Sequence, residues 1–116
     1  MPSPDIVRLR HMREAVVSAL EMAAGRQRPD LTENMMLAMA LARCLEILGD
    51  AASRVTPEVR LRFPGIPFAK MVSMRNHIIH AYFDINLDIV WTTVTDDLPS
   101  VLPALDSALA EIDVLD

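Results

Sequence analysis

Four polar side chains with potential catalytic chemistry fall within eight positions of an otherwise apolar stretch: Arg75, His77, His80 and Tyr82. Histidine titrates near neutrality, so it can take a proton from a ribose 2′-hydroxyl and return one to a leaving oxygen. Arginine can hold the phosphate oxygens on which negative charge accumulates. Arg75 and His80 could therefore cleave RNA without a metal, although arginine, histidine and tyrosine occur together in many helices.

The positions of the apolar residues indicate that a helix over residues 67–83 carries these groups. Its apolar stripe consists of Phe68, Met71, Val72, Ile78, Ile79 and Tyr82. Arg75 lies in the middle of that stripe, so its guanidinium must be paired, face a cleft or remain half-solvated. His80 would lie about 140° from Arg75 in a regular helix. Either the helix distorts near residue 79, or a site combines residues from two chains.

Two other interpretations of the histidines remain open. His77 and His80 stand three positions apart, and Asp84 follows four residues later. Two histidines and a carboxylate on one helix can bind a transition metal, although no further histidine or cysteine lies nearby. Histidines on the solvated back of a helix, with no chemical role, would give the same pattern.

Length and composition favour one all-α domain over residues 1–116. Apolar residues make up 52 % of the chain, which has only three glycines and is rich in alanine, leucine and methionine. No apolar run approaches the roughly 18 residues of a membrane span, and the start lacks the regions of a signal peptide. The single Cys44 rules out a disulfide framework or a cysteine metal cluster. We therefore expect a cytoplasmic protein with no membrane contact.

Charge is distributed unevenly along the chain. Residues 1–75 contain all 11 lysines and arginines together with eight acids, whereas residues 76–116 contain eight acids and no lysine or arginine. The net charge of −5 argues against a passive nucleic-acid binder and gives no reason to expect DNA binding. The first two thirds could still present a basic patch, and the acidic last part could equally be an ordinary solvated face.

Two helices are predicted before the motif segment. The first begins near Asp5 and ends at Gly25, and a polar linker over residues 26–30 leads to a second helix over residues 31–55. The run Met35–Ala42 is apolar on all sides, so this helix is either central in a bundle or faces a second subunit.

A polar stripe follows that run, at Arg43, Glu46, Asp50 and Arg54. It could be self-paired and solvated, or it could supply the acid that Arg75 requires, and we favour the second interpretation.

The remaining segments are a short helix near Glu58–Phe63 and a seam of apolar residues over 87–112. Pro99 and Pro103 predict a kink or break in the last helix near residues 95–99. No hairpin signal is evident.

Arg75-x4-His80-x-Tyr82 resembles the R-x4-H-x-Y motif of HepT-like proteins, a branch of the HEPN (higher eukaryote and prokaryote nucleotide-binding) superfamily. The resemblance covers residues 31–112, and the first helix by topology only. Further similar blocks, in order, are Phe63-Pro-x-Ile66-Pro67-Phe68, Met74-Arg75-Asn76, His80-Ala-Tyr82-Phe83, Asp88-Ile-Val90-Trp91 and Asp97-Leu98-Pro99. Gly49-Asp50-Ala51 stands where relatives often have Gly-Glu-Ala, so the carboxylate is one methylene shorter.

The resemblance implies a four- to five-helix HEPN-type bundle that forms a homodimer and joins two motif copies across a cleft. It implies the toxin of a type II toxin–antitoxin pair: an RNA endonuclease without metal or other cofactor. A small nucleotidyltransferase antitoxin would neutralise this toxin by attaching AMP to the motif tyrosine. The alternative is a dimeric, non-catalytic module that binds a nucleotide or that nucleotidyltransferase.

The resemblance also assigns roles to residues. Arg75 would stabilise the phosphate, His80 would act as acid or base, and Tyr82 would be the modification target. The supporting residues would be Asn76, Asp50 and Glu46.

Overall fold

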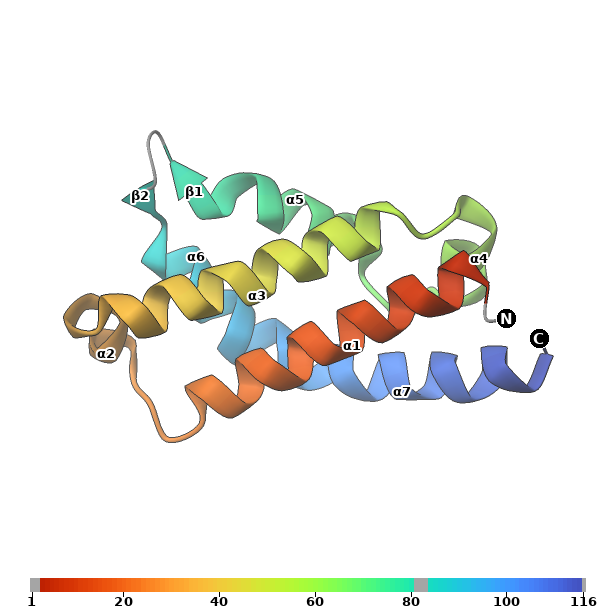
Figure 1. The fold of residues 1–116 in the computed structure, drawn as a ribbon, viewed down its shortest axis with the longest axis horizontal. Coiled ribbons are helices and arrows are strands. Elements are labelled where there is room, and N and C mark those ends of the chain that lie inside the picture. Colours follow the sequence, from red (N-terminus) through yellow and green to blue (C-terminus); the bar gives the residue numbers. More distant parts are fainter. Residues whose placement is uncertain (1–2, 81–83, 116) are drawn as a thin grey trace.

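Rods of helix that alternate in direction along the chain form the body of the protein (Figure 1). The computed structural model describes residues 3–80 and 84–115, excluding the side chains of His80 and residues 113–115. The rods are α1 (Pro4–Ala23), α3 (Met35–Ser53), α5 (Phe68–Ile78) and the continuous series α6 (Leu87–Thr92), η2 (Thr93–Asp97) and α7 (Leu98–Leu115). The expected all-α fold class is confirmed, and the rods pack as a helical bundle.

Helix α3 is the centre of the packing. It lies between α1 and α5, and α1 also packs along α7. The apolar seams predicted from the sequence face this core, because each places a residue inward every three or four positions. The largest fully buried side chains are Leu9, Met12, Leu31, Leu41, Leu45, Leu48, Met71, Ile78, Leu98, Leu105, Ile112 and Val16.

The start of α1 differs from the sequence prediction by two residues. Ser3 is the N-cap, and its hydroxyl accepts a hydrogen bond from the amide of Ile6. Asp5 instead lies in the first turn, where its carboxylate accepts hydrogen bonds from the amide and the hydroxyl of Thr56, both at 2.9 Å. The aspartate therefore ties the start of α1 to the start of α4 (Pro57–Arg62), the short helix predicted near this position.

The second predicted helix is two helices. Helix α2 (Arg28–Glu33) occupies most of the predicted polar linker, and α3 begins at Met35. Asn34 separates them in an extended conformation, with its side-chain oxygen accepting a hydrogen bond from the amide of Leu37. An asparagine that caps a helix is not itself in the helical conformation, so the prediction of a single helix over residues 31–55 was wrong.

The motif helix ends earlier than predicted. Helix α5 stops at Ile78, and strand β1 (Ile79–His80) pairs antiparallel with β2 (Asp84–Ile85). Two consecutive β-branched residues favour the extended backbone, and the amide of Asn86 donates to the carbonyl oxygen of Ile78 at 2.6 Å. The helix predicted over residues 67–83 was therefore wrong at Ile79 and His80, and the alternative of a distortion near residue 79 is confirmed. The expectation of no hairpin was also wrong.

The last rod keeps its predicted seam and its predicted irregularity. Between α6 and α7 the five residues of η2 form one π-helical turn, and the amide of Leu98 donates to the carbonyl oxygen of Thr93. Pro99 has no amide hydrogen to donate, which accounts for a widened turn at this place. The rod continues through Pro103, so the irregularity is a bulge and not a break.

Within residues 3–80 and 84–115, no helix has both the length and the apolar character required to cross a membrane.

Candidate functional site

The site is built where α3 and α5 approach most closely. Gly49 faces α5, and a Cβ atom there would meet the Cβ of Arg75 and come within 2.9 Å of the carbonyl oxygen of Met71. Only glycine allows the two backbones this near. The sequence signal was a glycine inside a predicted helix, which costs about 1 kcal/mol relative to alanine and so indicates a packing requirement.

This approach brings Arg75 beside the acid that follows Gly49. One guanidinium nitrogen of Arg75 lies 3.7 Å from a carboxylate oxygen of Asp50, which is an ion pair without a close hydrogen bond. The side chain of Arg75 is 29 % exposed, as expected for a guanidinium in the middle of an apolar stripe. The predicted pairing with an acid of the second helix is confirmed for Asp50.

The other two proposed supporting residues, Asn76 and Glu46, contact Arg75 and Arg43 respectively. Asn76 accepts hydrogen bonds from Nε and Nη2 of Arg75 at 3.3 and 3.2 Å, so it fixes the direction of the guanidinium. Glu46 pairs with Arg43 at 3.4 Å and does not pair with Arg75. Each arginine of this region therefore has a partner that is held only loosely at the surface.

An open cavity of about 330 Å³ lies over the Arg75–Asp50 pair. Its lining residues are Arg43, Glu46, Asp50, Arg75 and Ile79. The guanidinium of Arg75 is thus accessible from solvent along a groove between α3 and the end of α5. A phosphate group could reach it there, and the pairing with Asp50 is weak enough to be replaced by a bidentate contact.

The predicted acid–base residue follows directly in β1. The backbone of His80 pairs with that of Asp84 across the hairpin. Because the chain leaves the helix after Ile78, the separation of about 140° that a regular helix would impose on Arg75 and His80 does not apply. The side chain of His80, and Tyr82 as a whole, lie outside the described residues.

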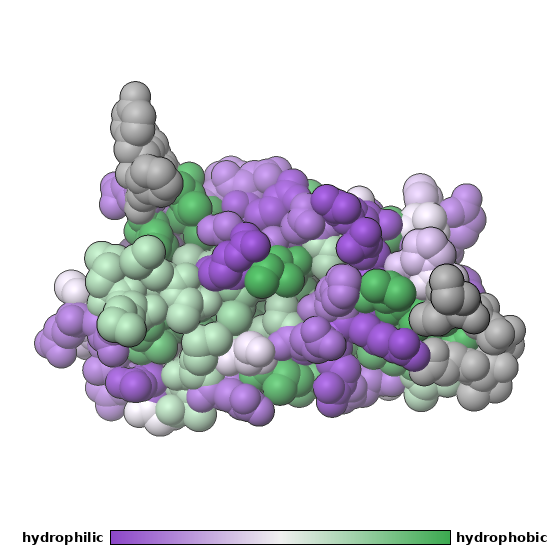
Figure 2. Space-filling view, viewed as in Figure 1, coloured by the Kyte–Doolittle hydropathy of each residue, from purple (hydrophilic) through white to green (hydrophobic). Residues whose placement is uncertain are grey.

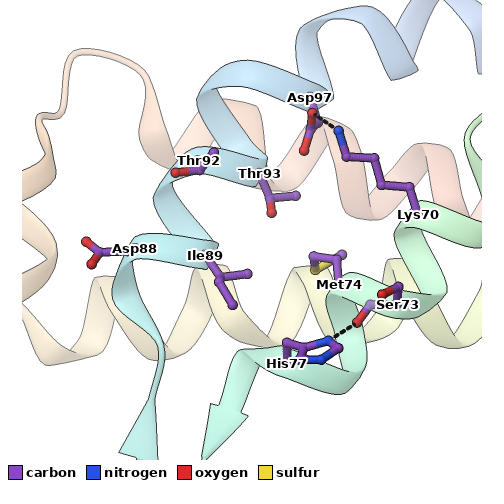
Figure 3. Close-up of a pocket in the computed structure, with 9 residues that line it drawn as sticks. All are labelled: Lys70, Ser73, Met74, His77, Asp88, Ile89, Thr92, Thr93 and Asp97. Atoms are coloured by element: carbon purple, nitrogen blue, oxygen red, sulfur yellow. Dashed lines mark hydrogen bonds and ion pairs between the residues drawn. The ribbon is translucent and has the colours of Figure 1, made fainter.

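His77 lies on the opposite side of α5, where a second cavity of about 450 Å³ opens toward α6 and η2 (Figure 3). Its Nδ1 is 2.7 Å from the carbonyl oxygen of Ser73 and so acts as the donor. Lys70 crosses the cavity to Asp97 at 2.8 Å. Lys70, Ser73 and His77 follow one another at helical spacing on this side of α5. No pattern in the sequence indicated that α6 would leave a cavity beside them.

The metal interpretation of the histidines involves His80, whose side chain is not described. Among the side chains that the structure describes, no three histidine, cysteine, aspartate or glutamate residues lie together.

An exposed apolar surface adjoins the Arg75 groove. Met35, Met36 and Met39 of α3 are 57 %, 83 % and 57 % exposed, and Ile79 of β1 is 43 % exposed. Figure 2 shows this surface as a pale green area over the first half of α3. We call these four residues the methionine patch. A cavity of about 310 Å³ lined by Met35, Met39 and Ile79 joins the patch to Arg43 and Glu46.

The comparison with protein families agrees with this bundle and motif. The family model described as Ribonuclease HepT-like matches residues 12–108. The chain therefore belongs to the HepT-like ribonuclease family.

Two relatives illustrate how much of the chain is shared. Putative RNase MJ1216 of Methanocaldococcus jannaschii is 26 % identical over 114 residues, covering 97 % of this chain and 94 % of that protein. Probable ribonuclease HepT of Thermococcus cleftensis is 39 % identical over 62 residues, covering 53 % of this chain and 56 % of that protein. No solved structure gives a significant match.

Proposed function

We propose that the protein is a metal-independent RNA endonuclease whose site is the groove around Arg75. The observation that carries the proposal is the half-buried Arg75, held by Asn76 and only loosely paired with Asp50, beneath an open cavity. A guanidinium in that state is positioned for an anion and is not neutralised by a close partner. Membership in the HepT-like ribonuclease family supports the same reaction class.

In this proposal, the ribose 2′-oxygen attacks the adjacent phosphorus and the bond to the 5′-oxygen breaks. A base removes the proton of the 2′-hydroxyl, and an acid protonates the departing 5′-oxygen. Arg75 stabilises the charge that builds on the non-bridging oxygens. The products are a 2′,3′-cyclic phosphate and a free 5′-hydroxyl. His80 supplies the proton transfer, and two copies of His80 could act as base and acid together.

A homodimer would supply that second copy. The methionine patch borders the groove, and an apolar surface of this kind on α3 marks an interaction site. We infer that a second copy of the chain covers the patch, so that the two grooves lie near one another. This interface includes the first half of α3, within the range Met35–Leu48.

We further propose that the protein is the toxin of a type II toxin–antitoxin pair and acts in the cytoplasm. Its antitoxin would be a small nucleotidyltransferase that transfers AMP to Tyr82, with pyrophosphate leaving if ATP is the donor. Tyr82 is two residues beyond His80. In this proposal, a bulky anion on its hydroxyl excludes an RNA phosphate from the Arg75 groove by repulsion and by its size.

The second cavity favours an alternative function. Its volume of about 450 Å³ lies in the range of small-molecule sites. Its polar lining includes two threonines, His77, Asp88 and the Lys70–Asp97 pair, beside apolar side chains of α5 and α6. A dimeric, non-catalytic module that binds a nucleotide there would not require Arg75 or His80.

The decisive experiment is cleavage of 5′-labelled RNA by the purified protein in the presence of EDTA. The proposal expects cleavage by the wild type, cyclic phosphate ends, and no cleavage by the His80→Ala variant. Equal cleavage by wild type and His80→Ala would refute it. The alternative expects no cleavage, and it expects binding of a nucleotide that is lost in Lys70→Ala and retained in Arg75→Ala.

A further inference from the structure

Basic residues are concentrated in one stretch of the chain. Residues 1–42 contain five lysines and arginines and five acids, and residues 76–116 contain none and eight acids. Residues 43–75, from the middle of α3 to Arg75 of α5, contain six lysines and arginines and only three acids. The positive excess of this acidic protein therefore lies within residues 43–75. Arg43 and Arg75 of this stretch line the groove, whereas Lys70 lines the second cavity.

Two of these arginines share a single carboxylate. Asp50 pairs with Arg54 through one oxygen at 3.3 Å and with Arg75 through the other at 3.7 Å. One negative charge thus separates two guanidiniums, and a positive charge remains without an acid of its own. Arg54 and Asp50 are 55 % and 54 % exposed, so both face solvent. Pairs at such distances and exposure contribute little to stability and exchange readily for phosphate.

The carboxyl end of α3 is adapted to hold a cation there. Arg60 donates hydrogen bonds to the carbonyl oxygens of Ala52 and Val55, at 2.9 and 3.1 Å. Its guanidinium therefore covers part of the negative end of the α3 dipole, which would otherwise repel a phosphate. Arg54 caps the same helix end with its backbone amide, which donates to the carbonyl oxygens of Ala51 and Ala52, and this leaves its side chain to pair elsewhere. Its guanidinium points along the surface to Asp50.

The position of Arg54 relative to the methionine patch shows which end of the groove a dimer would leave open. Met39 and Arg54 are 15 residues apart on α3, which corresponds to about 22 Å along the helix axis. Arg75 meets α3 between them, at Gly49 and Asp50. A dimer that covers the patch would leave the Arg54 end of the groove open to solvent.

We propose that Arg54 is a positioning residue that binds the RNA phosphate adjacent to the one held by Arg75, so that single-stranded RNA leaves the groove over the carboxyl end of α3. This inference rests on the proposed function. Displacement of Asp50 by two neighbouring phosphates frees both guanidiniums at once. The substrate is single-stranded, because in-line attack by the 2′-oxygen requires a flexible backbone. A single strand can also bring a phosphate into contact with the half-buried Arg75.

The test measures RNA binding separately from cleavage. In a His80→Ala background, Arg54→Ala and Arg26→Ala are titrated into a fluorescent single-stranded RNA at several salt concentrations. Arg26 is an exposed arginine in the loop after α1, far from the groove, and gives the matched loss of charge. Arg54→Ala should weaken binding at least several-fold and lower the salt slope by about 0.7, the value for one single-strand phosphate contact. Arg26→Ala should match its parent.

The outcomes distinguish this inference from the proposed function. In the catalytically intact chain, Arg54→Ala should raise KM and leave kcat near wild type, and Arg54→Lys should recover most of the affinity. A fall in kcat with unchanged KM would mean that Arg54 only orients Asp50 and Arg75, and would overturn the proposal. So would binding equal to that of Arg26→Ala, or equal affinity for a duplex. If the wild type binds RNA through Arg54 and cleaves none, the nuclease proposal fails and this inference stands.

Discussion

Gly49 and Arg75 lie against each other without space for a side chain at position 49. The added Cβ of an alanine would overlap the Cβ of Arg75, which belongs to the stiff root of that side chain. The same contact sets the distance between α3 and α5 and the place from which the Arg75 side chain starts. A change at Gly49 therefore acts on the stability of the bundle and on the groove together.

Gly49→Ala should destabilise the protein despite the better helix propensity of alanine. Overpacking costs about 1–3 kcal/mol, and the propensity gain of about 1 kcal/mol offsets only part of it. Urea unfolding monitored by circular dichroism measures the net loss. Gly65→Ala is the control, because a Cβ at Gly65 meets nothing within 4 Å. Equal stability of the two variants would show that the helices can separate freely.

His80→Ala should lower the rate of RNA cleavage by at least ~10²-fold, the usual contribution of one proton-transfer group. Arg75→Ala should abolish cleavage and growth inhibition as well. His77→Ala should leave the rate near wild type, because His77 lies on the other side of α5. Melting curves must accompany Arg75→Ala, since the stem of this residue packs against Gly49. A large loss of rate in His77→Ala would indicate that the catalytic site lies in the second cavity.

Tyr82→Phe should fold and cleave RNA but remain toxic when the proposed nucleotidyltransferase antitoxin is co-expressed. The substitution keeps the ring and removes the hydroxyl that would accept AMP. Mass spectrometry of the co-expressed wild type should show a mass increase of one AMP moiety on the peptide containing Tyr82. Rescue of growth by the nucleotidyltransferase in the Tyr82→Phe strain would mean that neutralisation does not require this hydroxyl.

Met36→Asp should dissociate the proposed homodimer. A carboxylate at a position that is 83 % exposed in one chain would be buried without a partner on association. Sedimentation velocity at micromolar concentration should show a dimer for the wild type and a monomer for Met36→Asp. Leu61→Asp is the control, since Leu61 is equally exposed on α4, outside the methionine patch. A wild-type monomer at that concentration would exclude the two-chain site.

Burial raises the pKa of the Cys44 thiol above its usual range, so the thiolate is disfavoured in the folded state. Below the pKa of the unfolded thiol, about 8.5, the stabilising contribution is fully present. As pH rises through the higher folded pKa, that contribution is lost. The stability of the wild type should therefore fall relative to Cys44→Ala at alkaline pH. Identical pH dependence of the two proteins would contradict a raised pKa.

The position of Arg75 could be predicted from the sequence because it depends on one local periodicity. Met71 and Ile78 fix the buried side of α5, and both are fully buried. An arginine between them at helical spacing must emerge from that side. The pairing with Asp50 followed from a second periodicity, that of the polar stripe on α3, and from the rule that a recessed guanidinium needs an acid.

The ends of the helices could not be predicted in the same way. Asn34 is acceptable inside a helix or as its cap, and the capping bond to Leu37 decides between them. Ile79 has a side chain suitable for either a helix or a strand, and its pairing with Ile85 decides for the strand. The second cavity depends on how α6 packs against α5, which no local pattern records.

The antiparallel order of the rods has a practical consequence for experiments on this protein. Helix α1 begins and α7 ends at the same end of the bundle, while the hairpin after α5 lies at the other (Figure 1). Affinity tags, fluorophores or surface linkers attached at either terminus would project away from the hairpin. Immobilised protein could therefore be presented to RNA or to a partner with the hairpin end turned outward, from whichever terminus is chosen.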